Sequence, residues 1–474
     1  MNVLAIDQGT SATKALLVGP GGAVLGAAEV PVRTRSVGTD GVEADPEELF
    51  GSVVAAGARA LAAAAAPAHA VALANQGETV LAWDRATGAP LTPAIVWQDR
   101  RAAGVCRRLA GRAEELAAIT GLRLDPYFAA PKMTWLRENS GPGGVVTTTD
   151  TWLLRRLGAD YVTDAATASR TMLLDLDTVT WSATACEAFG VDPGSLPAVS
   201  DCAGVVGETS AFGRPLPVAG IAVDQQAALF GERCLAAGDA KCTYGTGAFL
   251  LVNTGAPAVR SSAGLSASVA WRTGGAATYC LDGQVYTAGS AVRWLAGIGV
   301  LAAPAELDAV GGMVPDTGGV IFVPALAGLG APVWKPGARG MFTGMHLGTS
   351  REHLARAVAE GIAASVTLLA SAAAADLGSP LTSLRVDGGL TRSRLLVQAQ
   401  ADLLQVPVLI FRSPDATALG VAALARLGIS GPASAGEALG PAGAEEVVEP
   451  AITADEAAER MTAFRSALEL VVAQ

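Results

Sequence analysis

The feature that most constrains the fold of this chain is a short apolar run followed by an acidic or glycine-rich turn, repeated in both halves of the sequence. The turns are Asp7-Gln8-Gly9-Thr10, Asp224-Gln225-Gln226, Gly245-Thr246-Gly247 and Asp387-Gly388-Gly389. One such turn alone is usually a plain hairpin turn. In open α/β sheets, however, ligands bind at the carboxyl ends of the strands. The recurrence therefore predicts an α/β chain with a site built from strand ends.

The chemistry of these turns suits phosphate and a divalent cation. Glycine lets backbone amides approach a phosphate closely, and threonine adds a hydroxyl donor. A carboxylate can hold Mg²⁺ or accept a proton. The sequence has no GxxxxGK[ST] motif, no GxGxxG after a strand and no GxSxG motif, which excludes a P-loop and gives no support to a dinucleotide fold or a serine hydrolase.

Both halves are expected to open with antiparallel strands and to continue with strand–helix units. In the first half we expect strands over residues 2–6, 14–18, 23–32 and 71–74 and a helix over 45–66. In the second half we expect strands over 220–223, 240–243, 248–253, 277–280, 284–287, 319–324, 384–386 and 406–411, with helices over 350–375 and 391–404, from 417, and over 453–472. Asp282-Gly283 is expected to be a hairpin turn, and Ser350 with Glu352 to cap the long helix. This order predicts two α/β halves with mixed sheets.

Composition and simple motifs argue against several other classes of protein. The net charge is −11 over 474 residues, which disfavours nucleic acid as a partner. The first residues lack the basic region of a signal peptide, and the apolar stretch 60–74 is interrupted by Pro67 and His69, so no membrane span is expected. The six cysteines form no CxxC pair and the three histidines no zinc motif. We therefore expect a cytoplasmic protein with reduced thiols.

A second cluster of polar and aromatic residues lies in the first half. It comprises Gln76-Gly77-Glu78, the stretch from Ile95 to Arg101, and Leu124-Asp125-Pro126-Tyr127-Phe128. One interpretation is structural: Trp97 belongs to the core, and Arg100 and Arg101 begin a solvated helix. The functional one is a small polar pocket, in which Glu78 accepts hydrogen bonds from hydroxyls.

These residues together carry a family resemblance: the chain resembles the FGGY carbohydrate kinases over nearly its whole length. The most specific stretches are Gly220 to Gly231, Thr243-Tyr244-Gly245-Thr246-Gly247, Ile95 to Arg101, Val323-Pro324-Ala325, Gly328 to Trp334, and Leu384 to Gly389. Pentulose kinases of the family usually carry Asp-Asn where this chain has Asp224-Gln225. The resemblance is therefore greatest to the branch that phosphorylates glycerol.

The resemblance implies two actin-like (ribonuclease H-like) ATPase domains with a cleft between them. The polyol side would be residues 1–222 and the ATP side 223–474. ATP and Mg²⁺ are the implied cofactors and a small polyol or sugar the implied partner. A homo-oligomer, dimer or tetramer, is consistent with the family.

The resemblance also implies roles for individual residues. Asp224 would be the catalytic base, and Asp7 would hold Mg²⁺ together with Asp224. The implied ATP-binding residues are Thr10, Ser11, Lys14, Gly245, Thr246, Gly388 and Gly389. The implied substrate-binding residues are Gly77, Glu78, Trp97, Tyr127, Asp224, Gln225 and Tyr286, the last at a position where phenylalanine is usual.

One position departs from the family pattern. Glycerol kinases carry an arginine where this chain has Gly77, so a charged donor to the polyol is missing, a loss of about 1.5–3 kcal/mol. Three hypotheses remain open. The first is a glycerol kinase; the second is a kinase for a four- or five-carbon polyol or ketose, with a pocket widened at Gly77. The third is an actin-like ATP-binding regulator without sugar turnover, against which Asp224 argues.

Overall fold

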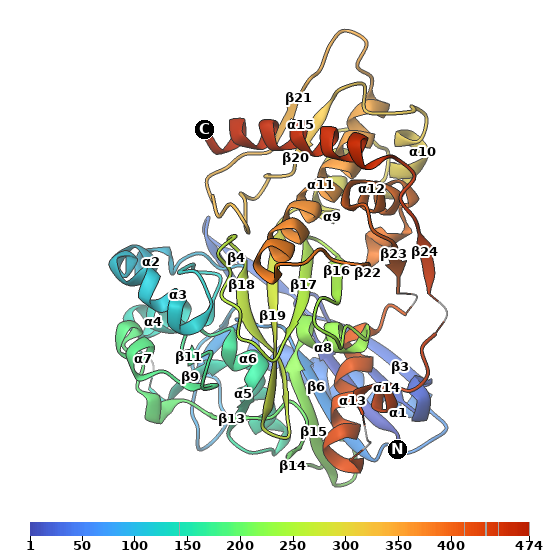
Figure 1. Cartoon of the computed structure of the whole chain (residues 1–474). Coiled ribbons are helices and arrows are strands. Elements are labelled where there is room, and N and C mark those ends of the chain that lie inside the picture. The colour runs from blue at the N-terminus through green and yellow to red at the C-terminus, as the bar shows by residue number, and fades with distance from the viewer. Residues whose placement is uncertain (142, 412, 432–433, 444, 474) are drawn as a thin grey trace.

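Two large β-sheets organise the molecule, which was analysed as a computed structural model (Figure 1). The structure describes the whole chain apart from residues 142, 412, 432–433, 444 and 474. The first sheet has the order β14 (Val205–Thr209), β15 (Leu216–Val223), β6 (Ala70–Asn75), β1 (Val3–Gln8), β2 (Ala12–Val18) and β3 (Val24–Pro31). Strands β1, β2 and β3 are antiparallel, whereas β6 is parallel to both β1 and β15.

The second sheet repeats this arrangement. Its order is β18 (Ser266–Thr273), β19 (Ala276–Val285), β17 (Ala248–Gly255), β16 (Ala240–Tyr244), β22 (Leu384–Asp387), β23 (Val408–Ile410) and β24 (Glu446–Val448). Strands β16, β17 and β19 are antiparallel, and β22 is parallel to β16 and β23. In each sheet three adjacent strands are antiparallel and the next two add in parallel. In the second sheet β18, which lies between β17 and β19 in the sequence, pairs on the outer side of β19. The prediction of two α/β halves with mixed sheets is confirmed.

Smaller sheets extend both halves. A five-stranded sheet has the order β4 (Thr34–Val37), β5 (Gly41–Ala44), β8 (Ala94–Ile95), β7 (Val80–Trp83) and β9 (Val145–Thr148). Three strand pairs are β10 (Val162–Asp164) with β13 (Ala198–Ser200), β11 (Leu174–Asp175) with β12 (Thr180–Trp181), and β20 (Ile321–Val323) with β21 (Met341–Thr343). The loop between β6 and β7 carries Gly77 and Glu78, so this extension helps to place the polar cluster.

The helices pack against these sheets. They are α1 (Pro46–Ala63), α2 (Ala103–Arg108), α3 (Ala113–Thr120), α4 (Ala129–Ser140), α5 (Thr149–Leu157), α6 (Ala165–Ser169), α7 (Ala183–Phe189), α8 (Asp224–Gly231), α9 (Gly289–Gly297), α10 (Leu307–Gly311), α11 (Arg351–Leu377), α12 (Arg394–Leu404), α13 (Ala416–Ser430), α14 (Ala435–Leu439) and α15 (Ala454–Ala473). One apolar core lies between α1 and the first sheet, and another between α11 and the second sheet.

Helix termini follow the capping signals in the sequence, with one correction. The Asp45 side chain accepts the Glu47 amide, and Pro46 is the first residue of α1, as predicted. At α11, however, the residue that completes the capping box with Ser350 is His353, three positions further on, and not Glu352. The imidazole Nδ1 accepts the Ser350 amide at 3.2 Å, a role that sequence motifs assign to Glu or Gln.

The expected hairpin at Asp282-Gly283 is wrong. Strand β19 runs without a break from Ala276 to Val285 and pairs with β17 and β18 on its two sides. The hairpin turn lies at Gly274-Gly275, where both residues have positive φ. Two strands on either side supply hydrogen bonds to the backbone around Asp282, which overrides the local turn propensity.

Helices α8 and α13 join the two halves. A Cβ on Gly420 would lie 1.8 Å from the Ala227 carbonyl oxygen, and one on Gly231 would lie 2.0 Å from that of Ala416. Glycine therefore allows the two helices to touch backbone to backbone. Helix α13 also packs on β15, β6 and β1 of the first sheet. The division at residue 222 falls within β15 and stays a prediction.

Within the described residues, one helix, α11, is long and apolar enough to cross a membrane. Inside the molecule 72% of its most apolar window is buried. That burial is typical of a core helix of a globular domain.

Candidate active site

Asp224 occupies the junction between β15 and α8, at the carboxyl end of a buried parallel strand. Its Oδ1 accepts the Gln225 amide at 2.7 Å. The pKa of Asp224 is raised to about 6, chiefly by burial and also by the nearby Glu78 carboxylate, against the opposing effect of the Gln225 amide. A carboxyl group with a pKa near the working pH is suited to accept a proton.

Asp224 lines a cavity of about 30 Å³ between the two halves of the molecule. The first half and α8 contribute Glu78, Tyr127, Arg170, Val223, Asp224, Gln225 and Gln226, and the second sheet contributes Phe249, Leu251, Asp282 and Gly283. Three carboxylates, one guanidinium and two amides therefore line one cavity together with aromatic rings. Such a set can bind and orient a small molecule with several hydroxyl groups.

A buried ion cluster forms one wall of this cavity. Arg170 Nε donates to Glu78 Oε1 at 2.6 Å, and Arg170 Nη1 pairs with Asp282 on β19. Burial raises the pKa of Glu78, whereas Arg170 opposes that shift. Burial lowers the pKa of Arg170, but Asp282 and Glu78 outweigh this effect and raise it above its ordinary value. Because both acids depend on one guanidinium, the cluster ties the first half to the second sheet.

The Glu78 backbone is held in an unfavourable conformation. Its φ is +57°, in the left-handed region that non-glycine residues seldom occupy. Such a conformation costs about 1–3 kcal/mol and is typical of functional sites. Here it turns a carboxylate from the loop after β6 into the cavity.

Trp97 connects the cavity with the first hairpin. Its ring makes edge-on contacts with Tyr127 and Phe249, with centroid distances of 5.8 and 6.2 Å. Its Nε1 donates to Thr10 Oγ1 at 2.9 Å, and Thr10 Oγ1 donates to Gln76 at 3.0 Å. Trp97 therefore serves both as part of the apolar core and as a link between the polar cluster and the strand end after β1.

Gln225 is positioned by a buried lysine. Lys241 Nζ donates to Gln225 Oε1 at 2.6 Å and to Thr243 Oγ1 at 2.8 Å. Because the amide oxygen is taken by Lys241, the amide NH₂ of Gln225 remains as the donor on the cavity side.

Gly77 is packed against a cavity residue. A Cβ on Gly77 would lie 2.8 Å from Cγ2 of Val223, closer than atoms can approach without movement. Val223 therefore takes up space beside Gly77, and the wall at this point is apolar rather than charged.

Asp7 lies at the end of β1, in the same sheet as the strand end that carries Asp224. The pKa of Asp7 is raised to about 7, chiefly by burial and also by the Asp224 carboxylate, against the opposing effect of Lys14. Lys14, on the adjacent strand β2, forms an ion pair with Asp415, the residue before α13. Ser11 is exposed in the turn between β1 and β2.

The Asp7 and Asp224 carboxylates are compatible with a divalent cation. The Asp224 carboxylate disfavours ionisation of Asp7, an effect that a cation between them would reverse. Across the described parts of the chain, no group of three or more His, Cys, Asp or Glu side chains could hold a metal. Mg²⁺ does not require one, because it usually takes one or two carboxylates and completes its shell with waters and substrate phosphates.

The strand ends of the second sheet are built from glycine. The Gly245 amide donates to the Gly247 carbonyl at 2.9 Å, which forms a tight turn after β16, and Thr246 Oγ1 accepts from Arg293 at 3.4 Å. On the adjacent strand β22, Gly388 has a φ of +92°, and a Cβ there would lie 2.5 Å from the Tyr244 carbonyl oxygen. A Cβ on Gly389 would have no described atom within 4 Å. The two turns thus lie side by side and expose backbone.

Tyr286 does not line the cavity. Its ring stands beside Gly330, and its pKa is raised to about 12, chiefly by burial and also by Asp125, against the opposing effect of Arg100. The aromatic residue that the second sheet contributes is Phe249, on β17. Tyr286 comes directly after the last residue of β19, beyond the part of that strand that carries Asp282 and Gly283.

Sequence reasoning missed three cavity residues, Arg170, Phe249 and Asp282. Asp282 was assigned to a turn. Arg170 follows the small residues Ala165–Ser169 of α6, and its burial, with only 5% of the residue exposed, is known from the structure and not from the sequence. Phe249 follows the Gly245-Thr246-Gly247 turn by two residues, close enough to have been considered with it.

Comparison with known proteins supports a single family. The model described as the N-terminal domain of the FGGY family of carbohydrate kinases matches residues 2–231, and its C-terminal counterpart matches residues 240–428. The chain is 44% identical over 457 residues to a glycerol kinase of Alkalilimnicola ehrlichii, covering 92% of each protein. It is 46% identical over 437 residues to one of Thermus brockianus, covering 89% of this chain and 88% of that protein.

Solved structures agree with this assignment. Plasmodium falciparum glycerol kinase with ADP has a TM-score of 0.92 at 29% identity, with coverage of 100% of this chain and 98% of that one. A ligand-bound xylulose kinase from Lactobacillus acidophilus has a TM-score of 0.89 at 22% identity, covers the same shares, and shows the shared fold.

Proposed function

The chain belongs to the FGGY family of carbohydrate kinases, and from this premise we propose that it transfers a phosphoryl group from Mg-ATP to a hydroxyl group of glycerol. The fold is that of the family, two actin-like α/β domains. The observation that carries the proposal is the position of Asp224. Its carboxylate is the titratable group that lines the hydroxyl-binding cavity and also neighbours the acidic strand end at Asp7.

In the proposed reaction Asp224 accepts the proton of the attacking hydroxyl group. Glu78, the Gln225 amide and Tyr127 orient the polyol, while Trp97 and Phe249 exclude water from one side. Transfer of a phosphoryl group asks little covalent chemistry of the protein, so positioning and charge neutralisation supply most of the rate. The enclosed cavity provides that positioning.

The nucleotide side is proposed to come from both sheets. Thr10, Ser11 and Lys14 lie on the first hairpin, where a hydroxyl and an ammonium group can meet terminal phosphates. Gly245 and Thr246 would contact the phosphates from the second sheet, and Gly388 and Gly389 would border the adenosine. Asp7 and Asp224 would hold Mg²⁺, which neutralises phosphate charge when bound.

We propose glycerol rather than a longer polyol or ketose as the substrate, because the Val223 side chain fills the space beside Gly77. The second hypothesis needs a pocket widened at that position, yet Val223 Cγ2 stands 2.8 Å from where a Cβ would be. The buried Arg170 guanidinium, which lines the cavity, supplies the cation that Gly77 lacks.

The division into residues 1–222 and 223–474, a cytoplasmic location and a homo-oligomer are part of the same proposal. They rest on the family alone. Size-exclusion chromatography with light scattering would establish the oligomeric state.

The test is release of ADP from Mg-ATP by the purified protein with glycerol, erythritol, pentitols and ketopentoses. We expect the largest kcat/KM with glycerol and a loss of at least about a thousandfold in Asp224→Asn. Asp40→Asn, an exposed aspartate, is the matched control and should be unaffected. A higher kcat/KM with a pentitol or ketopentose would instead support the second hypothesis. ATP hydrolysis without any polyol that persists in Asp224→Asn would contradict the mechanism.

A further inference from the structure

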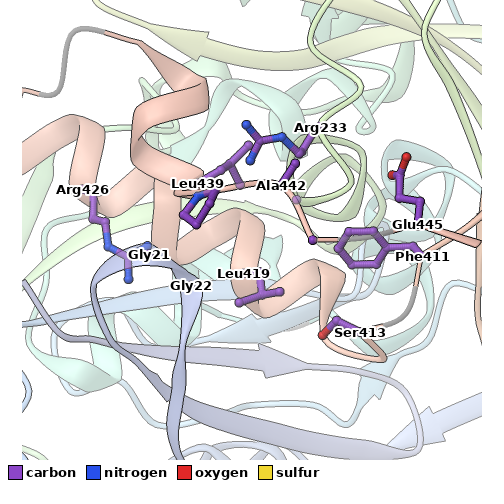
Figure 2. Close-up of a pocket in the computed structure, with 13 residues that line it drawn as sticks. Gly21, Gly22, Arg233, Phe411, Ser413, Leu419, Arg426, Leu439, Ala442 and Glu445 are labelled. Carbon is purple, nitrogen blue, oxygen red and sulfur yellow. The ribbon is translucent and has the colours of Figure 1, made fainter.

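A second, larger cavity lies at the far end of α8 from the candidate active site (Figure 2). Its volume is about 370 Å³, within the range of small-molecule sites. It is lined by Gly21, Gly22, Gly231, Arg233, Phe411, Ser413, Leu419, Arg426, Leu439, Pro441, Ala442, Gly443 and Glu445. Asp224 begins α8 and Gly231 ends it, so the cavity lies roughly 10 Å along that helix from the proposed base.

Arg426 is a buried cation without a counterion. The residue is only 8% exposed, and its guanidinium donates to three carbonyl oxygens, those of Val18 at 3.0 Å, Gly19 at 2.6 Å and Ala438 at 3.1 Å. Among the described residues its Nε has no acceptor and no carboxylate pairs with it. Burial lowers its pKa. A buried charge that is unpaired is costly, and an anion in the cavity would compensate it.

Arg233 adds a second guanidinium to the same cavity. Its Nη1 donates to the Gly440 carbonyl at 2.8 Å, and within the described ranges it has no ion-pair partner either. The acid that lines the cavity, Glu445, is already paired with Arg385 at 3.1 Å. Both arginines also bind the backbone between Ala438 and Gly440, so the positive charge is fixed in place.

The remaining walls are apolar. Phe411, Leu419 and Leu439 lie between the charged groups, as Figure 2 shows. Guanidinium groups match the geometry of phosphate and carboxylate oxygens, whereas the apolar walls suit a carbon body.

We propose that this cavity binds a small organic oxyanion, with its phosphate or carboxylate group between Arg233 and Arg426 and its carbon body against Phe411, Leu419 and Leu439. The proposal does not depend on the reaction at Asp224, because no cavity residue takes part in that site.

Isothermal titration calorimetry of the full chain tests the proposal with three probes: phenyl phosphate, benzoate and phenol. We expect one of the two anions to bind at one site per chain and phenol to give no heat. Which anion binds more tightly decides between phosphate and carboxylate. Arg233→Gln should weaken binding about tenfold or more, because one charged hydrogen-bond donor is lost, and Arg233→Lys should lose less.

Two variants serve as controls. Arg59→Gln removes an exposed arginine on α1 and should leave the affinity unchanged. Lys14→Gln alters the proposed phosphate side of the active site and should also leave it unchanged. The proposal is overturned if neither anion binds, if Arg233→Gln binds as tightly as the unaltered protein, or if the binding is lost in Lys14→Gln alone.

Discussion

The two large sheets share one strand order but differ in the residues at the ends of their strands. In the first sheet, β1 and β15 lead into carboxylates, Asp7 and Asp224, whose pKa values burial raises to about 7 and about 6. In the second sheet, the turns after β16 and β22 contain Gly245, Gly388 and Gly389. The first sheet thus presents two carboxylates at its strand ends, whereas the second presents glycine backbone beside a single carboxylate, Asp387 at the end of β22.

The strand ends of the two sheets carry different residues because they are proposed to contact different parts of the substrates. A proton acceptor needs a side chain that is partly removed from water, so that its pKa approaches the working pH. A surface for phosphate or adenosine needs backbone without a Cβ in the way. The two sheets therefore share one fold, and the residues in the turns after their strands determine which chemical group each sheet binds. Five measurements would test that division, beginning with the largest expected effect.

Removing the ionic link between the two regions should cost the most. Arg170→Met leaves Glu78 and Asp282 buried without their shared partner, and breaking a buried ion pair costs about 3–5 kcal/mol. Urea denaturation measures the loss. Arg108→Met is the matched control, because Arg108 and Glu138 form a pair in which both side chains are about half exposed, with expected loss below about 1 kcal/mol. Equal losses in the two variants would show that the cluster does not hold the halves together.

Lowering the pH should reduce kcat/KM by protonating the carboxylates at the strand ends of the first sheet, and should leave the glycine turns of the second sheet unchanged. Asp224 must be ionised to accept a proton, so kcat/KM should fall about tenfold per pH unit below its pKa of about 6, or roughly a hundredfold by pH 4. Initial rates from pH 4 to 8 measure this. Binding of ATP without Mg²⁺ should change far less, because the glycine turns of the second sheet do not titrate, whereas Mg²⁺ binding should weaken as Asp7 and Asp224 are protonated.

Stability should move in the opposite direction to the rate. A carboxyl group whose pKa is raised on folding binds its proton more tightly in the native state. Its contribution to stability is complete below the ordinary pKa near 3.8 and is lost as pH rises through about 6. Asp224→Asn should therefore lose less stability than the unaltered protein between pH 5 and 8. A rate that falls in parallel with unfolding would contradict the assignment to Asp224.

Substitution by alanine should affect the two glycines after β22, Gly388 and Gly389, to different extents. Gly388→Ala forces a Cβ into a positive-φ position 2.5 Å from the Tyr244 carbonyl, for an expected loss of about 2 kcal/mol and weaker ATP binding. Gly389→Ala meets no described atom within 4 Å and should retain stability. Denaturation curves and ATP titrations of both variants make the measurement. Equal stability of the two would remove the case for close approach at Gly388.

The smallest effect should be the coupling energy between Gly77 and Val223. Gly77→Ala places a Cβ 2.8 Å from Val223 Cγ2 and should destabilise the protein by about 1–3 kcal/mol. Val223→Ala removes that methyl group, so the double variant should recover about 1 kcal/mol relative to the sum of the single changes. Unfolding free energies of the four proteins give the coupling. Strict additivity would mean that Val223 does not fill the space beside Gly77.

Individual residues show which parts of the fold and of the candidate site could be predicted from the sequence. The strands that precede Asp7, Asp224 and Gly388 were predicted because apolar runs ending in Asp or Gly are local signals. The strand through Asp282 was missed because Asp-Gly favours a turn locally, whereas pairing on both sides of β19 decided otherwise. Tyr286 was assigned to the substrate pocket from the family resemblance; its ring stands beside Gly330, and the aromatic residue that the second sheet contributes to the cavity is Phe249.

The sequence alone determined the two repeated α/β halves, the acidic and glycine-rich strand ends, and the family, because each depends on residues adjacent in the chain. Only the tertiary structure decided which side chains meet across the halves: Arg170 between Glu78 and Asp282, Val223 against Gly77, and two arginines around a separate cavity. Those contacts join residues far apart in sequence, and their geometry is set by how α8, α13 and the two sheets pack.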